Sequence, residues 1–499
     1  IELPDFTDTS KQSLTQYFSD IYIDLNDLKS IKMPDSSRSL ILDPSLELNK
    51  FLSLSNLTIT GSEREFDFQF DEFKSDLGEL NLPGSMSFSR DSKMIKIAPS
   101  EDHLGELLIK DFRLGRFLSE DLLGNISGSV QPIIEISNEG ELSFKLERSS
   151  ISNVGFNGYN ISQIEILEGS YANDLLKAGV AINDENVKLD MSCELFLGNK
   201  HRYGGVLNVE SANLDALNLT SDTSIVSTSI EIELNETKRS VFEGQLVSTN
   251  IDYYRGEDTL LIPLTTISIL KSPSNEHYTL KSDIIDMEMK GLFDWENLLV
   301  DFTDDLAKVF PTIKVGNVVS TQQRNNNIYN DISFNVLTKD MERIFQMFAP
   351  ELEIQNETGL SGKYNSKKEY LDIVFRSPYL SYGDIVVNEI YGTQIISNDS
   401  IFCDYIVDYV SYNDSLKFNQ IEFVADGTEG VLNSNLTWAP GTDEASSINW
   451  DTRIHDNDHI EVILKPSFFS LDGMSWGIMK ESDISITTED IHISKFELN

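Results

Sequence analysis

The sequence is poor in cysteine and in basic residues. Among 499 residues only Cys193 and Cys403 are cysteines, too few for a disulfide scaffold. Lys and Arg number 39 against 82 Asp and Glu, which gives a formal net charge of -43. Nucleic-acid binding requires a basic surface for the phosphates, so this charge argues against it. It also argues against docking of outer surfaces on an anionic membrane, and acidic surfaces discourage association between strand edges.

The sequence also lacks long apolar runs and linkers. No run of about eighteen apolar residues occurs, so we predict no transmembrane helix. No Pro-rich, Gly/Ser-rich or single-charge run divides the chain, so we expect one continuous architecture although the length would suit about three domains. The chain begins at Ile1 without Met or a signal-like segment and ends in mid-pattern at Leu498. We therefore expect an internal piece of a longer protein.

No motif of a reaction centre is present. His455, Asp456 and His459 bring metal-binding residue types together, but their segment has turn composition and favours a hairpin. Acidic segments around Asp184 and Asp426 lack the ligand spacing of a calcium loop. The sequence therefore predicts no enzyme, no metal site and no cofactor.

What the sequence does contain is alternation of apolar and polar residues. In EFDFQFDEF, for example, Phe66, Phe68 and Phe70 alternate with polar residues. Alternation with a period of two places apolar side chains on one face of a strand, so we predict an all-β fold. The alternating apolar positions singled out are Phe66, Phe68, Phe70, Leu142, Phe144, Leu146, Ile230, Ile232, Leu234, Ile332, Phe334, Val336, Leu371, Ile373, Phe375, Ile460, Val462, Leu464, Ile484 and Ile486.

The period changes between residues 292 and 348. Apolar residues at spacings of three and four predict an amphipathic helix over 292–310, ended by Pro311. A second helix is predicted over 339–348, before Pro350. Two helices are too few to cover the apolar faces of so many strands, so these faces must cover one another or cover something else. Alternation alone does not choose between a sandwich, a closed barrel and an open, bent sheet.

Several segments resemble the TamB proteins of the Bacteroidetes, members of the AsmA-like superfamily. The clearest are GLSGKYNSKKEYLDIVFRSPYLSYGDIVVNEI and KPSFFSLDGMSWGI, the second with Pro466, Gly473 and Trp476. LIKDFRLGRFLSEDLLGNISGSV, VGFNGYNISQIEILEGSY and SDIIDMEMKGLFDWENL also match. Each motif is degenerate, and their order along the chain makes the resemblance specific.

The resemblance implies an elongated antiparallel sheet bent into a U-shaped apolar groove, a β-taco. It implies β-groove segments at 1–291 and 353–499, a helix-containing insert at 292–352, and a further C-terminal domain beyond 499. It also implies a periplasmic bridge that conducts phospholipids between the inner and outer membranes, with the alternating positions above lining the groove against acyl chains. The implied partners are an inner-membrane anchor before this piece and a TamA- or BamA-like outer-membrane barrel after it.

Two other functions remain open. One is a scaffold for outer-membrane protein assembly that works through strand edges. The other is a secreted β-sandwich that binds a surface. A linear sheet would keep Cys193 and Cys403 far apart, so we predict two free, mostly buried thiols.

Overall fold

The computed structural model describes the backbone of four strands between residues 39 and 61, and residues 65–309 and 329–499 apart from short gaps. These gaps are at 76, 92–93, 101–104, 119–121, 296, 414–415, 429, 457–458, 472, 488–489 and 495–496, and at 499. The chain divides into two compact units, unit 1 (Ile1–Leu264) and unit 2 (Thr265–Asn499). The predicted boundaries of the helix-containing insert, at 291 and 352, both lie inside unit 2. The boundary between the two units lies instead within strand β17 (Asp258–Ser272).

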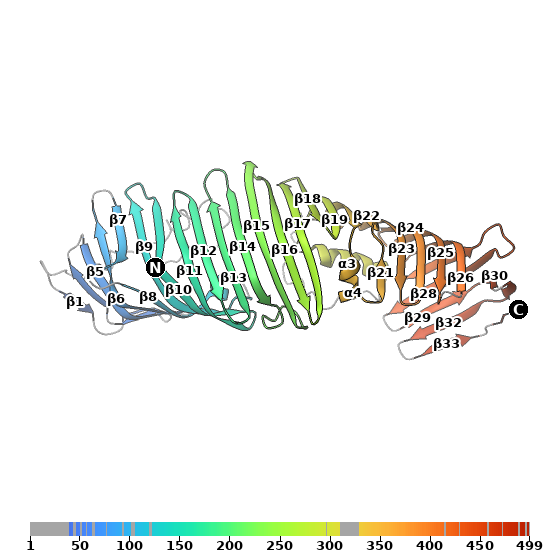
Figure 1. The fold of residues 1–499 in the computed structure, drawn as a ribbon, viewed down its shortest axis with the longest axis horizontal. Helices are drawn as coiled ribbons and strands as arrows, with labels where there is room; N and C mark the ends of the chain where they lie inside the picture. Colours follow the sequence, from blue (N-terminus) through green and yellow to red (C-terminus); the bar gives the residue numbers. More distant parts are fainter. Residues whose placement is uncertain are drawn as a thin grey trace. The chain divides into compact units, whose positions relative to one another are not determined.

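Nearly all of the described chain is antiparallel β-sheet, which confirms the all-β prediction (Figure 1). In unit 1 the strands before β17 are β1 (Ser39–Leu42), β2 (Leu46–Asn49), β3 (Leu52–Ser55), β4 (Leu57–Gly61), β5 (Glu65–Ser75), β6 (Gly78–Arg90), β7 (Met94–Pro99), β8 (Leu107–Arg113), β9 (Asn125–Ser137), β10 (Leu142–Phe156), β11 (Tyr159–Ala172), β12 (Leu175–Asn183), β13 (Val187–Phe196), β14 (Arg202–Asn213), β15 (Ser224–Lys238) and β16 (Val241–Arg255). From β9 to β16 each strand pairs with the next one in the sequence.

Unit 2 follows the same plan. After β17 its strands are β18 (Asn275–Ser282), β19 (Ile285–Leu292), β20 (Asp331–Thr338), β21 (Leu352–Ile354), β22 (Gly359–Asn365), β23 (Tyr370–Tyr382), β24 (Ile385–Ser397), β25 (Ser400–Tyr412), β26 (Leu416–Thr428), β27 (Val431–Trp438), β28 (Ser446–Asp456), β29 (His459–Leu464), β30 (Ser467–Leu471), β31 (Met474–Ile478), β32 (Ser482–Thr487) and β33 (Ile491–Ser494). Strand β23 is long enough to pair with β22 along one half and with β21 along the other.

The described chain has three short helices, α2 (Leu114–Leu118), α3 (Leu298–Val309) and α4 (Glu342–Phe348). The two helices predicted near 292–348 are therefore confirmed, whereas α2 was not predicted. The predicted start of the first helix at Leu292 is wrong, because Leu292 pairs with Asp331 in the β19–β20 ladder. The second helix begins at Glu342 rather than Lys339, since the Lys339 N–H donates to Ile284 O over 2.8 Å. Strand pairing at Leu292 and a backbone hydrogen bond to the β18–β19 turn at Lys339 therefore outweigh the helical periodicity.

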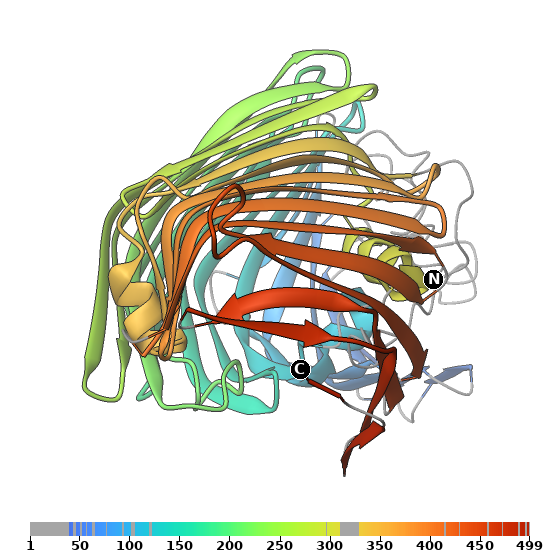
Figure 2. The same ribbon diagram turned by 90° about the vertical axis from the view of Figure 1, so that its right-hand side faces the viewer.

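Several strands bend in mid-length. Figure 2 shows the orange strands of unit 2 curving along their length. Two residues within them, Glu389 in β24 and Gln420 in β26, have φ near 50°, a conformation that is uncommon outside glycine and that interrupts regular pleating. Unit 1 has Asp111, Asn153 and Asn250 in the same conformation within β8, β10 and β16.

The bend shifts the side-chain alternation by one residue. Ile390 and Val387 lie three positions apart on β24, yet both pack against the same buried cluster, which includes Val407 and Ile421. Strict alternation would place Ile390 and Val387 on opposite faces of the sheet. One apolar face therefore continues past the bend.

Candidate functional site

The candidate site of unit 1 is a continuous apolar face. Directly opposed residues of antiparallel strands share a face, so the register traces rows of side chains across the sheet. One row runs from β5 to β16 and is apolar or aromatic at every position before its final glycine. Its members are Phe66, Phe88, Ile97, Ile134, Phe144, Tyr171, Leu176, Leu195, Tyr203, Leu234 and Gly244.

The other predicted positions of unit 1 flank this row. We call the row and these flanking residues together the unit 1 face. Ile230 and Ile232 alternate with Leu234 on β15, as Leu142 and Leu146 do with Phe144 on β10. Phe68 is opposed to Met86 and Phe70 to Leu82. Most of these side chains are half-buried, and Ile232 is 37% exposed.

Unit 2 has an equivalent apolar face. One row holds four of the predicted residues and continues from β20 to β33 with two interruptions, Gly427 and Thr452. Its members are Ile332, Tyr364, Leu371, Ile396, Ile401, Gly427, Leu432, Thr452, Val462, Ile484 and Ile493.

The neighbouring rows of the unit 2 face hold the rest of the predicted set. Phe334, Ile373 and Leu464 lie in one row. Val336 and Phe375 lie in the next. Ile460 and Ile486 are opposed to each other. The structure thus gathers the predicted positions of each unit on one face.

Several residues of the unit 2 face were not predicted. The best buried are Tyr364, Ile396, Ile401 and Cys403. The alternation of Ile401, Cys403 and Tyr405 in IFCDYIV was a detectable signal. Tyr364 gave none, because its neighbours in GKYNSKK are polar or glycine.

Two glycines on the unit 2 face leave room for the aromatic rings opposite them. Gly392 is opposed to Tyr405, and a Cβ at Gly392 would lie 2.0 Å from the Tyr405 ring. At Gly362 it would lie 2.8 Å from the Phe334 ring. Both rings therefore pack directly over a glycine, and any larger residue at that position would displace the ring away from the sheet.

The opposite face of unit 1 is polar. A row on that side passes through Lys145, Ser170, Lys177, Glu194 and Glu233, with Gly204 between the last two. The Lys177 ammonium lies 2.5 Å from the Glu194 carboxylate. Along this row the side of the unit 1 sheet opposite the apolar face is polar and charged.

Helix α3 covers part of the unit 2 face. Its Leu298 and Phe302 pack against the buried cluster that contains Tyr364 and Leu371. The Phe302 and Tyr364 rings meet edge to face at 5.5 Å between centroids. The Tyr364 hydroxyl donates to Asp305 Oδ2 over 2.8 Å, so the helix is held by a polar contact as well.

A second polar contact holds the start of α3. Asn330 is completely buried, and its Oδ1 accepts a hydrogen bond from the Asp294 N–H over 2.8 Å. Its Nδ2 donates to Asp301 Oδ2 over 3.3 Å. Burial and the neighbouring Asp305 carboxylate raise the pKa of Tyr364, so its hydroxyl remains a donor at all ordinary pH values.

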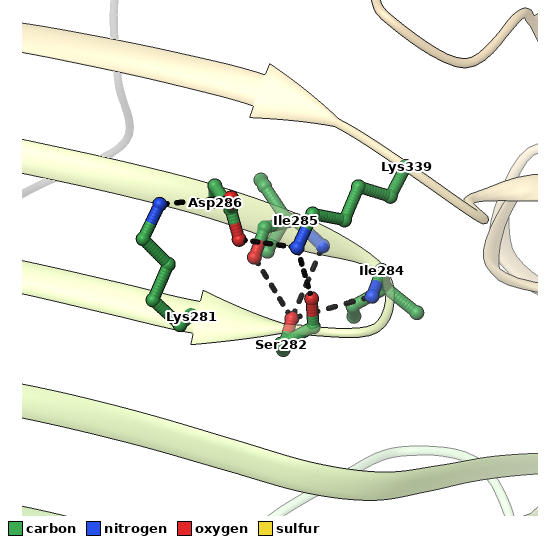
Figure 3. Close-up of polar contacts among 6 residues, drawn as sticks. All are labelled: Lys281, Ser282, Ile284, Ile285, Asp286 and Lys339. Carbon is green, nitrogen blue, oxygen red and sulfur yellow. Dashed lines mark hydrogen bonds and ion pairs between the residues drawn. The ribbon is translucent and has the colours of Figure 1, made fainter.

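A polar cluster fixes the turn between β18 and β19 (Figure 3). Asp286 forms ion pairs with Lys281 at 2.9 Å and Lys339 at 2.6 Å, and the Lys339 ammonium donates to Ser282 O over 2.9 Å. Burial alone would raise the pKa of Asp286, but the two lysines outweigh it and lower that pKa. A carboxylate paired in this way is suited to joining the turn to the segment before α4, not to proton transfer.

A buried carboxylate, Asp184, closes the turn between β12 and β13. It accepts hydrogen bonds from the Tyr159 hydroxyl, from Ser162 N and Oγ at 3.0 and 2.8 Å, and from Asn186 N at 3.1 Å. Burial alone would raise its pKa, but these bonds lower it to about 2. The carboxylate oxygens of Asp184 are therefore occupied by donors from its own fold.

Among the described residues, no group of three or more His, Cys, Asp or Glu is placed to hold a metal ion. Asp456 is opposed to His459 in the β28–β29 pair, as expected for a hairpin, and His459 Nε2 lies 3.1 Å from Ser485 Oγ. Cys193 and Cys403 are not joined by a disulfide, as predicted; Cys403 is buried as expected, whereas Cys193 is only half-buried. No helix in the described ranges is long and apolar enough to cross a membrane.

Comparison of the chain with protein-family models, curated proteins and solved structures finds no match. The resemblance to TamB proteins therefore stays a hypothesis that rests on the sequence segments quoted above.

Proposed function

We propose that this chain is a segment of a TamB-like periplasmic bridge, and that the unit 1 and unit 2 faces conduct phospholipid acyl chains between the inner and outer membranes. The observation that carries the proposal is the row from Phe66 to Leu234, in which strand after strand presents an apolar side chain. A packed core needs such residues only in patches, whereas a path for acyl chains is favoured by a row that runs from strand to strand.

The physical basis is the transfer of methylene groups out of water. Each methylene of an acyl chain exposed to water costs about 0.8 kcal/mol. An apolar face offsets this cost at every position and makes no directional contact, so a chain is free to slide along it. Head groups then stay in water beside the face.

The finer shape belongs to the same proposal. We propose that the bend at Glu389, Gln420 and their counterparts in unit 1 turns each face inward and forms a groove with a U-shaped cross-section. In support, the apolar face continues past the bend in each unit: Ile390 and Val387 share one cluster, and so do Ile151 and Val154.

The assembly scaffold is the second candidate. Strand β33 pairs with β32, and its Ile491 and Ile493 are exposed. An edge of this kind is able to accept a further strand. Capture of a client strand there, with no lipid on the faces, would favour assembly over lipid transport.

The decisive test compares neighbouring residues on opposite faces of one strand. A photocrosslinking amino acid at Phe144 should capture a radiolabelled phosphatidylethanolamine added to the purified chain. The same amino acid at Lys145, which is exposed on the polar face, should not. Equal capture from the two positions would contradict the proposal.

A charge placed on the face gives an independent measure. Ile232→Asp should reduce bound phosphatidylethanolamine severalfold, because a carboxylate next to acyl chains is costly to desolvate. Ile232 is 37% exposed, so the change should leave folding intact. Glu231→Lys, on the polar side of the same strand, is the matched control and should retain full binding.

A further inference from the structure

We propose that α3 is a displaceable plug on the unit 2 face, and that acyl chains reach the floor beneath it only after α3 is released. The inference rests on the proposed function and adds a regulated step to it. It is built from side chains within residues 298–305 of α3 and from β20, β22 and β23.

The first observation is that α3 occupies the surface an acyl chain would use. Leu298 and Phe302 lie on the cluster that holds Ile332, Tyr364 and Leu371. These three residues are 6%, 1% and 2% exposed, whereas Ile493, in the same row at β33, is 54% exposed. This row of the unit 2 face is therefore covered at β20, β22 and β23 and exposed at β33.

The second observation is that α3 and an acyl chain would contact the unit 2 face in the same way, through apolar groups. Leu298 and Phe302 contact the floor through apolar side chains, and an acyl chain is able to replace these two contacts. The twelve-residue α3 is too short to persist as a helix without packing. Acyl chains and α3 therefore compete for one surface.

The third observation explains why the resting state is closed. Lipid has no acceptor to replace Asp305 at the Tyr364 hydroxyl, or Asp301 at the Asn330 amide. Release of α3 returns two carboxylates to water but leaves buried donors facing hydrocarbon, which is unfavourable. These two contacts set how readily the plug opens, and Tyr364 acts as a positioning residue for α3.

The test uses the whole chain and a phosphatidylethanolamine with a diazirine in one acyl chain, with adducts mapped by peptide mass spectrometry. In the wild type, peptides of β14 and β15 should carry adducts, and the peptide of β22 should carry few. Tyr364→Phe keeps the ring but removes the donor, so adducts on β22 should rise severalfold. Phe302→Ala should have the same effect, and neither should change labelling of β14 and β15.

Hydrogen exchange of residues 298–305 reports release of α3 directly and should accelerate in both variants. Asp304→Asn, on the exposed side of α3, is the control and should change neither readout. Wild-type labelling of β22 as strong as that of β15 would overturn the plug. So would faster exchange of α3 without added adducts. Absence of adducts from both faces would instead contradict lipid conduction itself.

Discussion

Unit 1 and unit 2 carry the same kind of apolar face, but the predicted residues of the two faces differ in how far they are shielded from solvent. On unit 1 the predicted residues are half-buried or, at Ile232, exposed, although their neighbours Leu82, Met86 and Tyr171 are buried. On unit 2 the corresponding row under α3 is fully buried at Tyr364 and Leu371. The ladder of hydrogen bonds is continuous in both cases.

This difference separates two roles of an apolar side chain. Beneath α3 the side chains stabilise the folded unit as an ordinary core does. On the unit 1 face the hydrogen-bonded ladders hold the strands, and the half-exposed side chains contribute less to folding. We expect the two classes to respond differently to the same substitution.

The largest expected effect is on stability. Leu371→Ala should lower the free energy of unfolding of unit 2 by about 2–5 kcal/mol, because it leaves a cavity beneath α3. Ile232→Ala removes a side chain that is partly in water already and should cost about 1 kcal/mol or less. All four tryptophans lie in unit 2, so fluorescence during urea unfolding reports that unit alone. Equal losses at the two positions would remove the distinction between the faces.

The next effect concerns acid. The pKa of Asp184 in the folded chain is about 2, below the ordinary value of about 3.9. Because the pKa of Asp184 is lower in the folded chain than in the unfolded chain, its ionised form contributes about 2 kcal/mol to the free energy of unfolding. This contribution is complete above pH about 4 and is lost as the pH falls towards 2. Asp184→Asn should lower the stability of unit 1 by about this amount at neutral pH and flatten its acid dependence.

The measurement for Asp184 is urea unfolding followed by circular dichroism between pH 2 and pH 7. Glu185→Gln is a control in the same turn, where the side chain is exposed. An unchanged acid profile in Asp184→Asn would show that the hydrogen bonds at Asp184 do not stabilise the folded state.

The smallest effect leaves the protein intact and uses its own cysteines. Cys193 lies in a row of the unit 1 face with Ile232, and Cys403 lies on the unit 2 face opposite Ala425. Burial raises the pKa of the Cys403 thiol to about 11, so at pH 8 its thiolate fraction is about a hundredfold below that of a free cysteine. With an aromatic disulfide reagent, Cys193 should react in the native chain and Cys403 only after unfolding.

Bound phosphatidylethanolamine should slow the reaction of Cys193, since lipid would cover that part of the unit 1 face. A count of two thiols is expected in the denatured, unreduced chain. Equally fast reaction of both thiols in the native chain would show that the two faces are equally open.

The sequence predicted the strands because alternation is a local property. It identified Phe66, Phe144 and Leu234 separately, and the register then placed them in one row. The extent of the face past the bend was not predictable. Glu389 and Gln420 adopt positive φ without being glycine, so nothing in the sequence marked the shift from Ile390 to Val387.

The helices show a second limit. Leu292 fits the helical spacing, but its backbone hydrogen bonds belong to β19 and β20. That competition depends on a partner strand about forty residues away, which no local window contains. Tyr364 was missed for a related reason, since it is buried by α3 rather than by its own neighbours in the sequence.

Pairing between strands that are close in the sequence has a consequence for evolution. Because β23 to β27 each bond to the strands just before and after them, every hairpin is an interchangeable module, as in repeat proteins. Loss of β24 and β25 together would bring β23 beside β26 with its direction preserved, and Leu371 would then oppose Gly427 on the same face. The span of such a sheet is therefore free to change in steps of two strands, about 10 Å each, without redesign of the surface that it presents.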